Sequence, residues 1–176
     1  MECNLFMNLI ALSAKEIIPL EDEINTFLKS IFSSDVNVDI NEELSSGVLI
    51  INNEVIIGCG FVYVREMTQK SSNFQAAIIA CVAVDESYRG KGLCKEIISR
   101  LDQQISSACI NYSFLFAYEK NIYKSSGYQE LKTAINYFDK YKKQWNTFVY
   151  RGGMVKSFKK VKLSKDSVIN FNGCVY

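Results

Sequence analysis

Residues 81–94 carry the side chains and the spacing that suit anion binding, and they read Cys-Val-Ala-Val-Asp-Glu-Ser-Tyr-Arg-Gly-Lys-Gly-Leu-Cys. Two glycines let backbone N–H groups approach an anion more closely than side chains can, and a helix that follows adds the positive end of its dipole. Arg89 and Lys91 add two full positive charges. The stretch therefore predicts a binding site for a pyrophosphate.

Two common kinds of phosphate site do not fit this stretch. A Walker loop requires Gly-x-x-x-x-Gly-Lys followed by Ser or Thr, and the chain has no such run. A dinucleotide-binding fold places its glycine-rich turn after an early strand and an acidic residue about 20 positions later, and neither feature is present here. The predicted pyrophosphate therefore belongs to a ligand that neither of these two kinds of site binds.

The elements around this loop must be a strand and a helix. An apolar run over residues 74–84 predicts a strand buried on both faces. The helix that opens at Gly90 has an apolar stripe at helical spacing. We expect a buried strand over residues 112–118 next, and then a short helix over residues 119–126 that ends at Gly127. The stripe consists of Leu93, Ile97, Ile98, Leu101 and Ile105.

The first part of the chain predicts a strand, a helical region and a hairpin. We expect the strand over residues 3–12, and Ser13 with Glu16 forms a capping-box pattern at the start of the helical region. That region continues to about Phe32 and is split at Pro19. A short helix is expected over residues 39–44. The hairpin has strands over 47–52 and 55–64, joined by a tight turn.

Gly58 and Gly60 alternate in the second strand of the hairpin, which indicates a bend or the close approach of another backbone. After Gly127 we expect two or three further strands, one of them over residues 146–151. The order of elements predicts one domain, residues 1–176, with a mixed α/β sheet. Its central sheet is mostly antiparallel and contains one strand–helix–strand crossover.

Composition excludes several classes of chemistry. The 176 residues include no histidine, so triads built on Ser-His or Cys-His are excluded. Six cysteines without a Cys-x-x-Cys pair do not suit zinc, and we expect no metal cofactor. Free cysteines predict a reducing, cytoplasmic location. No apolar run approaches the roughly 18 residues of a membrane-spanning helix.

The net charge of +1 is unevenly distributed. Residues 1–60 hold ten acidic side chains and two basic ones, a net charge of −8, whereas residues 139–166 hold nine basic side chains and two acidic ones, a net charge of +7. Either segment can be a solvated surface or can attract a partner of opposite charge.

The loop and its strand resemble the core motif of the GNAT superfamily of acyl-CoA-dependent N-acyltransferases. That motif has an arginine or glutamine followed by x-x-Gly-x-Gly/Ala, after a strand similar to Val-Ala-Val. Here the strand is Val82-Ala83-Val84 and the motif is Arg89-Gly90-Lys91-Gly92-Leu93-Cys94. Cys94 departs from the pattern, since Gly or Ala is usual at this position.

A second motif of the superfamily is Tyr-x-x-x-Gly-Phe, about 30 residues downstream. The chain has Tyr123-Lys-Ser-Ser-Gly127-Tyr128, with tyrosine in the last position. The expected order of elements over residues 3–151 is also similar to that of the superfamily. Two motifs in the right order, on the right elements, make the resemblance specific.

The resemblance implies a GNAT fold, acetyl-CoA as the co-substrate, and the residues that would bind it and catalyse the transfer. The pyrophosphate would bind the N–H groups of residues 89–94, and the pantetheine arm would pair with the backbone of Val82, Ala83 and Val84 as an added strand. An amine would attack the thioester directly in a ternary complex. Tyr123 would be the acid that protonates the departing thiolate.

The general base stays open at this point. Some GNAT enzymes carry a glutamate within the central strand, where this chain has Ala80 and Cys81. Glu66, Asp85 and the C-terminal carboxylate of Tyr176 are alternatives, and so is a chain of water molecules without a dedicated base.

The resemblance also implies that the first helices line the acceptor cleft. Because residues 16–43 have an excess of acidic side chains, we expect a small cationic amine, such as an aminoglycoside or a polyamine. An alternative is acetylation of a macromolecule, either a protein or a charged tRNA, through the basic and aromatic residues 137–165. A non-catalytic acyl-CoA-binding module is a third alternative. We expect no membrane partner and disfavour nucleic acid, and we leave a homodimer through the late strands open.

Overall fold

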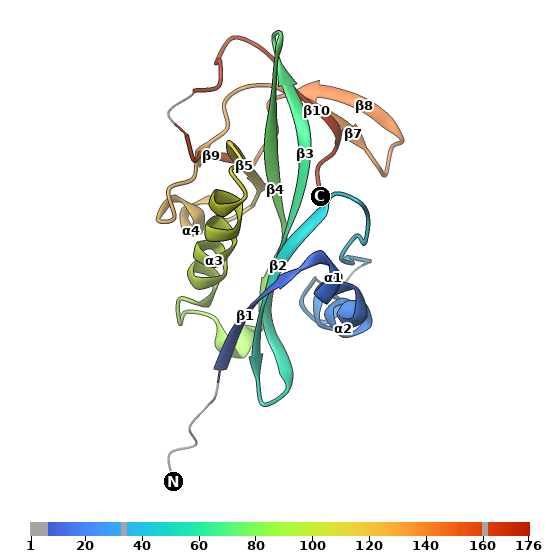
Figure 1. Cartoon of the computed structure of the whole chain (residues 1–176), viewed down its shortest axis with the longest axis vertical. Coiled ribbons are helices and arrows are strands. Elements are labelled where there is room, and N and C mark those ends of the chain that lie inside the picture. Colours follow the sequence, from blue (N-terminus) through green and yellow to red (C-terminus); the bar gives the residue numbers. More distant parts are fainter. Residues whose placement is uncertain (1–6, 33–34, 160–161) are drawn as a thin grey trace. The chain divides into compact units, whose positions relative to one another are not determined.

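The computed structural model describes residues 7–32, 35–159 and 162–176. The chain divides into two compact units. Unit 1 comprises Met1–Val62 and Cys81–Gln104, and unit 2 comprises Tyr63–Ala80 and Ile105–Tyr176. Two long strands, β3 (Val55–Gln69) and β4 (Ser72–Val84), have residues in both units (Figure 1). The expectation of a single domain stays a prediction.

Unit 1 has strands in its middle and helices on both sides. β1 pairs antiparallel with β2, from Met7 opposite Asn52 to Ser13 opposite Ser46, and β2 also pairs with β3. Figure 1 shows α2 and α3 on opposite sides of these strands. Besides its parts of β3 and β4, the unit contains β1 (Met7–Ser13), α1 (Ala14–Ile17), η1 (Ile18–Leu20), α2 (Glu21–Phe32), β2 (Leu44–Asn52), η2 (Glu86–Tyr88) and most of α3 (Leu93–Ser107).

Local sequence signals explain the start of the helical region. The N–H of Ser13 donates a hydrogen bond of 2.8 Å to Glu16 Oε2, as the capping-box pattern predicts, and the Ser13 Oγ donates another of 2.7 Å to the same oxygen. These bonds lower the pKa of Glu16. The region is split near Pro19, where the 3₁₀ turn η1 separates α1 from α2, because proline cannot donate the backbone bond that a continuous helix needs. The first strand begins at Met7, and residues 3–6 lie outside the described residues.

Gly60 allows α3 to pack closely on β3. A Cβ atom at Gly60 would lie 2.9 Å from Ile97 Cγ2 and 3.0 Å from Leu101 Cδ1. The apolar stripe predicted for this helix is buried, and its side chains occupy the space that a larger residue in β3 would need. The close neighbour of this glycine is therefore a helix side chain instead of another backbone.

The short helix expected over residues 39–44 is wrong. The chain forms a turn there, in which the N–H groups of Glu43 and Leu44 donate to Asn41 Oδ1 at 2.9 and 3.2 Å, and β2 begins at Leu44. An asparagine side chain that binds nearby backbone N–H groups competes with helix formation.

Unit 2 is formed mainly by strands, in the order β6-β9-β5-β4-β3-β10-β7-β8. Ala76–Ile79 of β4 pair parallel with Tyr112–Leu115 of β5, as a strand–helix–strand crossover requires. β10 also pairs parallel with β7, whereas β10–β3, β5–β9, β6–β9 and β7–β8 are antiparallel. Its elements are β5 (Tyr112–Phe116), α4 (Lys120–Lys124), β6 (Gln129–Glu130), β7 (Ile135–Asp139), β8 (Gln144–Phe148), β9 (Gly153–Ser157) and β10 (Ile169–Cys174).

This topology confirms the predicted fold class: a mixed α/β protein whose sheet is mostly antiparallel, with the crossover β4–α3–β5. Two or three strands were expected after Gly127, whereas the described residues there form five. They are short and pair with residues far away in sequence, so local patterns indicate them poorly. The core of unit 2 includes Met67, Ile78, Phe114, Ile135, Ile169 and Phe171. None of the helices in the described part of the chain has the length and hydropathy needed to cross a membrane.

Candidate active site

The loop between β4 and α3 is held at its start by Asp85. The N–H of Asp85 donates to Ile57 O at 2.8 Å, which extends the pairing of β4 with β3 by one residue. Its carboxylate Oδ1 accepts a hydrogen bond of 2.9 Å from the N–H of Ser87 and so caps η2. The chain thus leaves the strand in a fixed direction toward the two glycines.

Gly90 and Gly92 adopt left-handed backbone conformations beside open space. Their φ angles are +75° and +83°, which side chains with a Cβ rarely adopt. A Cβ on either residue would meet no atom within 4 Å. Among the described residues, none accepts a hydrogen bond from the N–H groups of Gly90, Lys91 and Gly92. The loop therefore presents backbone donors to a space that an external group can occupy.

The two cations of the loop are placed differently. The N–H of Arg89 already donates to Glu86 O at 3.2 Å, and its Nε donates to Val84 O at 3.2 Å, so Arg89 folds back on the end of β4. Lys91 is exposed, and its Nζ lies 4.8 Å from the centroid of the Tyr88 ring. Lys91 is thus the more accessible cation beside the open N–H groups.

Tyr88 anchors the loop, which sequence reasoning missed. Its hydroxyl accepts a hydrogen bond of 2.8 Å from Nδ2 of Asn52, at the end of β2. Asn52 is only 5% exposed, and its Oδ1 accepts no hydrogen bond from any residue that the structure describes. The two residues are 36 positions apart, and no local pattern links them.

Helix α3 begins at Leu93, three residues later than predicted. The N–H of Glu96 donates to Gly92 O at 3.2 Å, and Leu93 is buried. Cys94 is half-buried in the first turn of the helix. Gly90 and Gly92 therefore lie just before a helix of 15 residues, whose first N–H groups and dipole favour an anion.

Cys81 interrupts the regular geometry of β4 directly before Val82, Ala83 and Val84. Its φ angle is +52°, an unusual value for a residue other than glycine. The thiol of Cys59 donates to Cys81 O at 3.4 Å. Burial raises the pKa of both thiols, and that of Cys81 reaches about 11. The parallel register with β5 ends at Ile79, so Val82–Val84 lie beyond the stretch of β4 that pairs with β5.

A hollow of about 510 Å³ lies in unit 1, between α2, the start of β3 and the end of β4. Four carboxylates line it, and Phe27 contributes to its apolar part. Asp22 and Glu23 come from the first turn of α2, Glu54 from the β2–β3 turn, and Asp85 from the end of β4. No ion pair with another described residue compensates these charges. The hollow is therefore suited to a cation.

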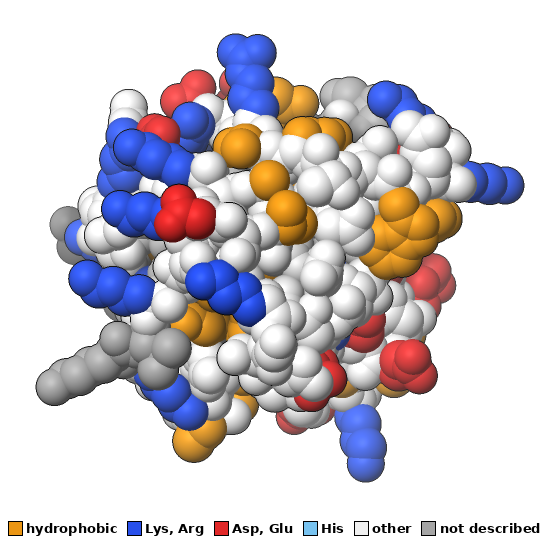
Figure 2. All heavy atoms as spheres, turned by 90° about the horizontal axis from the view of Figure 1, so that it is seen from above, with side chains coloured by type: hydrophobic (Ala, Val, Ile, Leu, Met, Phe, Trp, Pro, Cys, Tyr) orange, Lys and Arg blue, Asp and Glu red, His pale blue; other side chains and the backbone are white. Residues whose placement is uncertain are grey.

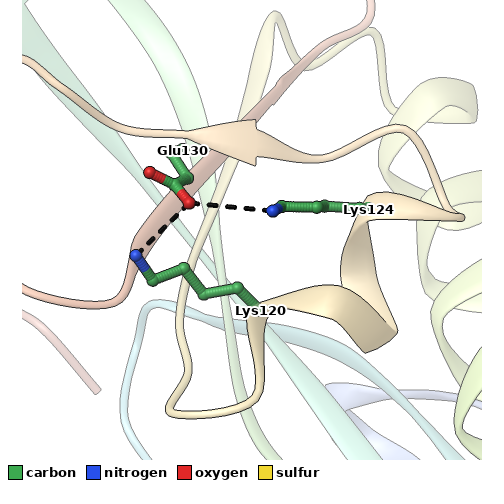
Figure 3. A network of polar contacts seen from close by, with 3 residues as sticks. All are labelled: Lys120, Lys124 and Glu130. Atoms are coloured by element: carbon green, nitrogen blue, oxygen red, sulfur yellow. Dashed lines mark ion pairs between the residues drawn. The ribbon is translucent and has the colours of Figure 1, made fainter.

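Tyr123 lies in unit 2, half-buried on α4. Lys120 and Lys124 flank it on the helix, and their Nζ atoms lie 3.4 and 3.8 Å from Glu130 Oε1 (Figure 3). Figure 3 shows both lysines directed at this one oxygen from the same side of β6. Gly127 follows the helix with a φ angle of +87°, as expected for a C-terminal cap.

Two of the three carboxylates considered as general bases accept hydrogen bonds within the structure. Glu66 is exposed, and its Oε1 accepts a hydrogen bond of 3.1 Å from Asn73 Nδ2. Asp85 caps η2. The ring of Tyr176 stacks on Tyr63 with centroids 3.7 Å apart, which fixes the side chain of this residue.

The basic and aromatic region of unit 2 is partly core and partly surface. Tyr137 is buried, whereas Tyr141 and Trp145 are 96% and 55% exposed. Figure 2 shows Lys and Arg side chains gathered on one side of the face drawn there, with hydrophobic side chains elsewhere on it. Residues 160–161 of this region lie outside the described residues.

The chain belongs to the GNAT acetyltransferase family. A family model described as "Acetyltransferase (GNAT) domain" matches residues 33–131, more than half of the 176 residues. This match contains both the loop 89–94 and Tyr123, and it confirms the expected family and the expected class of enzyme, an acyltransferase. A search of curated proteins finds no match.

Solved structures of low sequence identity share the fold. The GNAT family N-acetyltransferase YhbS from Escherichia coli, in complex with CoA, has a TM-score of 0.70 and 15% identity, with 100% of this chain and 99% of that chain covered. A predicted acetyltransferase from Clostridium acetobutylicum, with acetyl-CoA, has a TM-score of 0.56 and 20% identity, with 72% and 92% covered.

A third structure, a probable N-acyltransferase from Enterococcus faecalis V583, has a TM-score of 0.60 and 13% identity. The comparison covers 73% of this chain and only 33% of that protein, so this chain corresponds to about a third of its length. At such identities the three similarities establish the fold alone.

Proposed function

We propose that the protein transfers the acetyl group of acetyl-CoA to a primary amine of a small cationic acceptor, by direct attack in a ternary complex. The observation that carries the proposal is the loop before α3, where the N–H groups of Gly90, Lys91 and Gly92 have no acceptor among the described residues and the two glycines border open space. A helix start with free donors suits a pyrophosphate. The relatives solved with CoA and acetyl-CoA support this choice of co-substrate.

The pantetheine arm is proposed to pair with the backbone of Val82, Ala83 and Val84. These residues lie beyond the stretch of β4 that pairs with β5, and an extended ligand gains hydrogen bonds when it adds to a strand edge. The loop, Arg89–Cys94, then holds the pyrophosphate. Tyr123 is the proposed acid, whose phenol gives a proton to the departing thiolate.

The acidic hollow of unit 1 supports a cationic acceptor. Its four carboxylates would attract an ammonium group, and Phe27 would contact the carbon chain between ammonium groups. A macromolecular acceptor is the second candidate, favoured by the exposed Tyr141 and Trp145 near the lysines of the β7–β8 turn. A cytoplasmic location is part of the proposal and follows from the free cysteines.

An acceptor screen that measures CoA release tests the proposal. We expect turnover with polyamines or aminoglycosides and none with charged tRNA at physiological salt. Tyr123→Phe should lower kcat by about 10²-fold, since general acid catalysis contributes about that much or more. Acetyl-CoA affinity should stay unchanged. Turnover with tRNA alone would favour the second candidate, and the absence of turnover with every acceptor would contradict a catalytic role.

A further inference from the structure

The side chain of Asn52 is buried in unit 1 and forms a hydrogen bond through one end of its amide. Its Nδ2 donates to the Tyr88 hydroxyl at 2.8 Å, whereas its Oδ1 accepts no bond from the described part of the chain. A buried acceptor without a donor lowers stability, and a leucine side chain has the same branched shape without the polar atoms. What asparagine provides here, and an apolar side chain cannot, is the bond to Tyr88.

Asn52 is a fixed point of the sheet. It is the last residue of β2, and it lies opposite Met7 in the pairing of β1 with β2. Asn53 and Glu54 follow with φ angles of +49° and +66°, the left-handed values of a tight hairpin turn. A strand end that is held by a neighbouring strand and by a tight turn has little freedom to move. The Asn52 amide can therefore anchor another segment.

Tyr88 connects this anchor to the open loop. Its N–H donates to Asp85 O at 2.9 Å, which holds its backbone, and Asn52 holds its hydroxyl. Lys91 Nζ lies over its ring, 4.8 Å from the centroid, within the roughly 6 Å at which a cation and an aromatic ring attract each other. Because both ends of the tyrosine are held, its ring gives the Lys91 ammonium a defined place in the loop.

We propose that Asn52 and Tyr88 are positioning residues for acetyl-CoA binding, which hold the Lys91 ammonium ready for the pyrophosphate. The role rests on the proposed binding of acetyl-CoA at the loop Arg89–Cys94. A free lysine side chain samples many rotamers, and ordering it on binding lowers the affinity. Contact with the Tyr88 ring restricts Lys91 before the ligand arrives, so less of this loss remains. Neither Asn52 nor Tyr88 needs to touch the ligand for this effect.

Asn52→Leu separates positioning from a purely structural role. We expect the variant to raise the Kd of acetyl-CoA about threefold, because Tyr88 loses its anchor and Lys91 is less restricted. The midpoint of urea unfolding should not fall, since the variant also removes the buried oxygen that lacks a donor. A purely structural residue would show the opposite pattern, a lower midpoint with an unchanged Kd. Isothermal titration calorimetry and chemical denaturation measure the two quantities.

A double-mutant cycle tests whether Tyr88 acts through Lys91. Tyr88→Leu removes the ring and should raise the Kd about fivefold in the parent protein, but by less than about 1.5-fold in the Lys91→Gln background. Tyr88→Phe keeps the ring and loses the anchor, so it should match Asn52→Leu, and the two changes together should raise the Kd no further. The matched control is Tyr141→Leu, which removes a 96% exposed tyrosine of unit 2 and should leave the Kd unchanged.

Dephospho-CoA identifies the phosphate that the pair serves. This ligand keeps the pyrophosphate of CoA and lacks the separate phosphate on the ribose. The Kd of Tyr88→Leu should exceed that of the parent about fivefold with CoA and with dephospho-CoA alike. Equal Kd values for the two proteins with dephospho-CoA alone would assign Lys91 to the ribose phosphate and would overturn the role at the pyrophosphate.

The outcomes separate this proposal from the proposed function. If the parent binds acetyl-CoA and Tyr88→Leu raises the Kd equally in the parent and in Lys91→Gln, or in neither, the positioning role is wrong and the co-substrate assignment stands. If Asn52→Leu lowers the unfolding midpoint, Tyr88→Phe decides because it adds no atom, and an unchanged Kd for Tyr88→Phe overturns the role of the anchor. If the parent does not bind acetyl-CoA, the proposed co-substrate and the positioning role are both wrong.

Discussion

Four glycines of the chain share nearly the same left-handed backbone conformation, yet their surroundings are opposite. Gly90 and Gly92 in unit 1, with φ angles of +75° and +83°, have no atom within 4 Å of an added Cβ. Gly127 and Gly152 in unit 2, with φ angles of +87° and +85°, have other atoms within 4 Å of an added Cβ. A Cβ on Gly152 would lie 2.5 Å from Ala117 O.

The difference separates a glycine that serves packing from the glycines for which we propose a role in ligand binding. At Gly152 the protein's own backbone fills the space, so glycine is needed for the fold. At Gly90 and Gly92 the space is open, and the fold alone gives no reason to exclude a side chain except the φ angle. An external group that must approach the backbone closely, such as a pyrophosphate, supplies that reason.

The largest effect that tests this comparison is on stability. Gly152→Ala should lower the free energy of unfolding by about 3 kcal/mol, because left-handed strain costs roughly 1–2 kcal/mol and overpacking adds roughly 1–3 kcal/mol. Gly92→Ala should cost only the strain. Chemical denaturation, followed by circular dichroism, measures both.

Gly127→Ala is the control for this prediction. An added Cβ at Gly127 would lie 3.5 Å from Lys156 Cε, an ordinary contact, so this variant should behave like Gly92→Ala in stability. Equal losses in the free energy of unfolding for Gly152→Ala and Gly92→Ala would mean that the atoms around each glycine do not determine the cost of an added Cβ.

Elements with local signals were predictable from the sequence. Ser13 and Glu16 predict the start of the first helix, and Gly127 predicts the end of α4, because capping depends on residues within one turn. The strand before the loop and the apolar stripe of α3 follow from periodicity. For the same reason the loop 89–94 could be recognised as a candidate site before its geometry was known.

Features that depend on distant residues could not be predicted in this way. The hydrogen bond from Asn52 to Tyr88 and the approach of Asn37 to Cys81 join segments 36 and 44 residues apart. The short late strands are defined by their partners more than by their own residues. The helix expected at Asp39 is absent, since Asn41 binds the backbone of the following residues.

A smaller effect concerns the accessible cation of the open loop. Lys91→Gln should raise the Kd of acetyl-CoA about tenfold, which corresponds to about 1.4 kcal/mol, because the variant loses a charge beside the pyrophosphate. The affinity of the variant should also depend less on salt. Isothermal titration calorimetry at two salt concentrations measures both effects.

Lys29→Gln is the matched control for Lys91→Gln. Lys29 is an exposed lysine of α2 in the same unit, so its loss changes the net charge equally. An equal rise in Kd for the two variants would point to a general charge effect and would contradict a specific contact at Lys91.

We propose that the open backbone donors of the loop hold the pyrophosphate of acetyl-CoA. The most direct test is a titration of the ¹⁵N-labelled protein with acetyl-CoA, followed by the amide resonances of Gly90, Lys91 and Gly92. We predict that these resonances shift downfield and saturate together, while that of Gly152 stays in place. Saturable binding of acetyl-CoA with no shift at Gly90, Lys91 and Gly92 would contradict the claim.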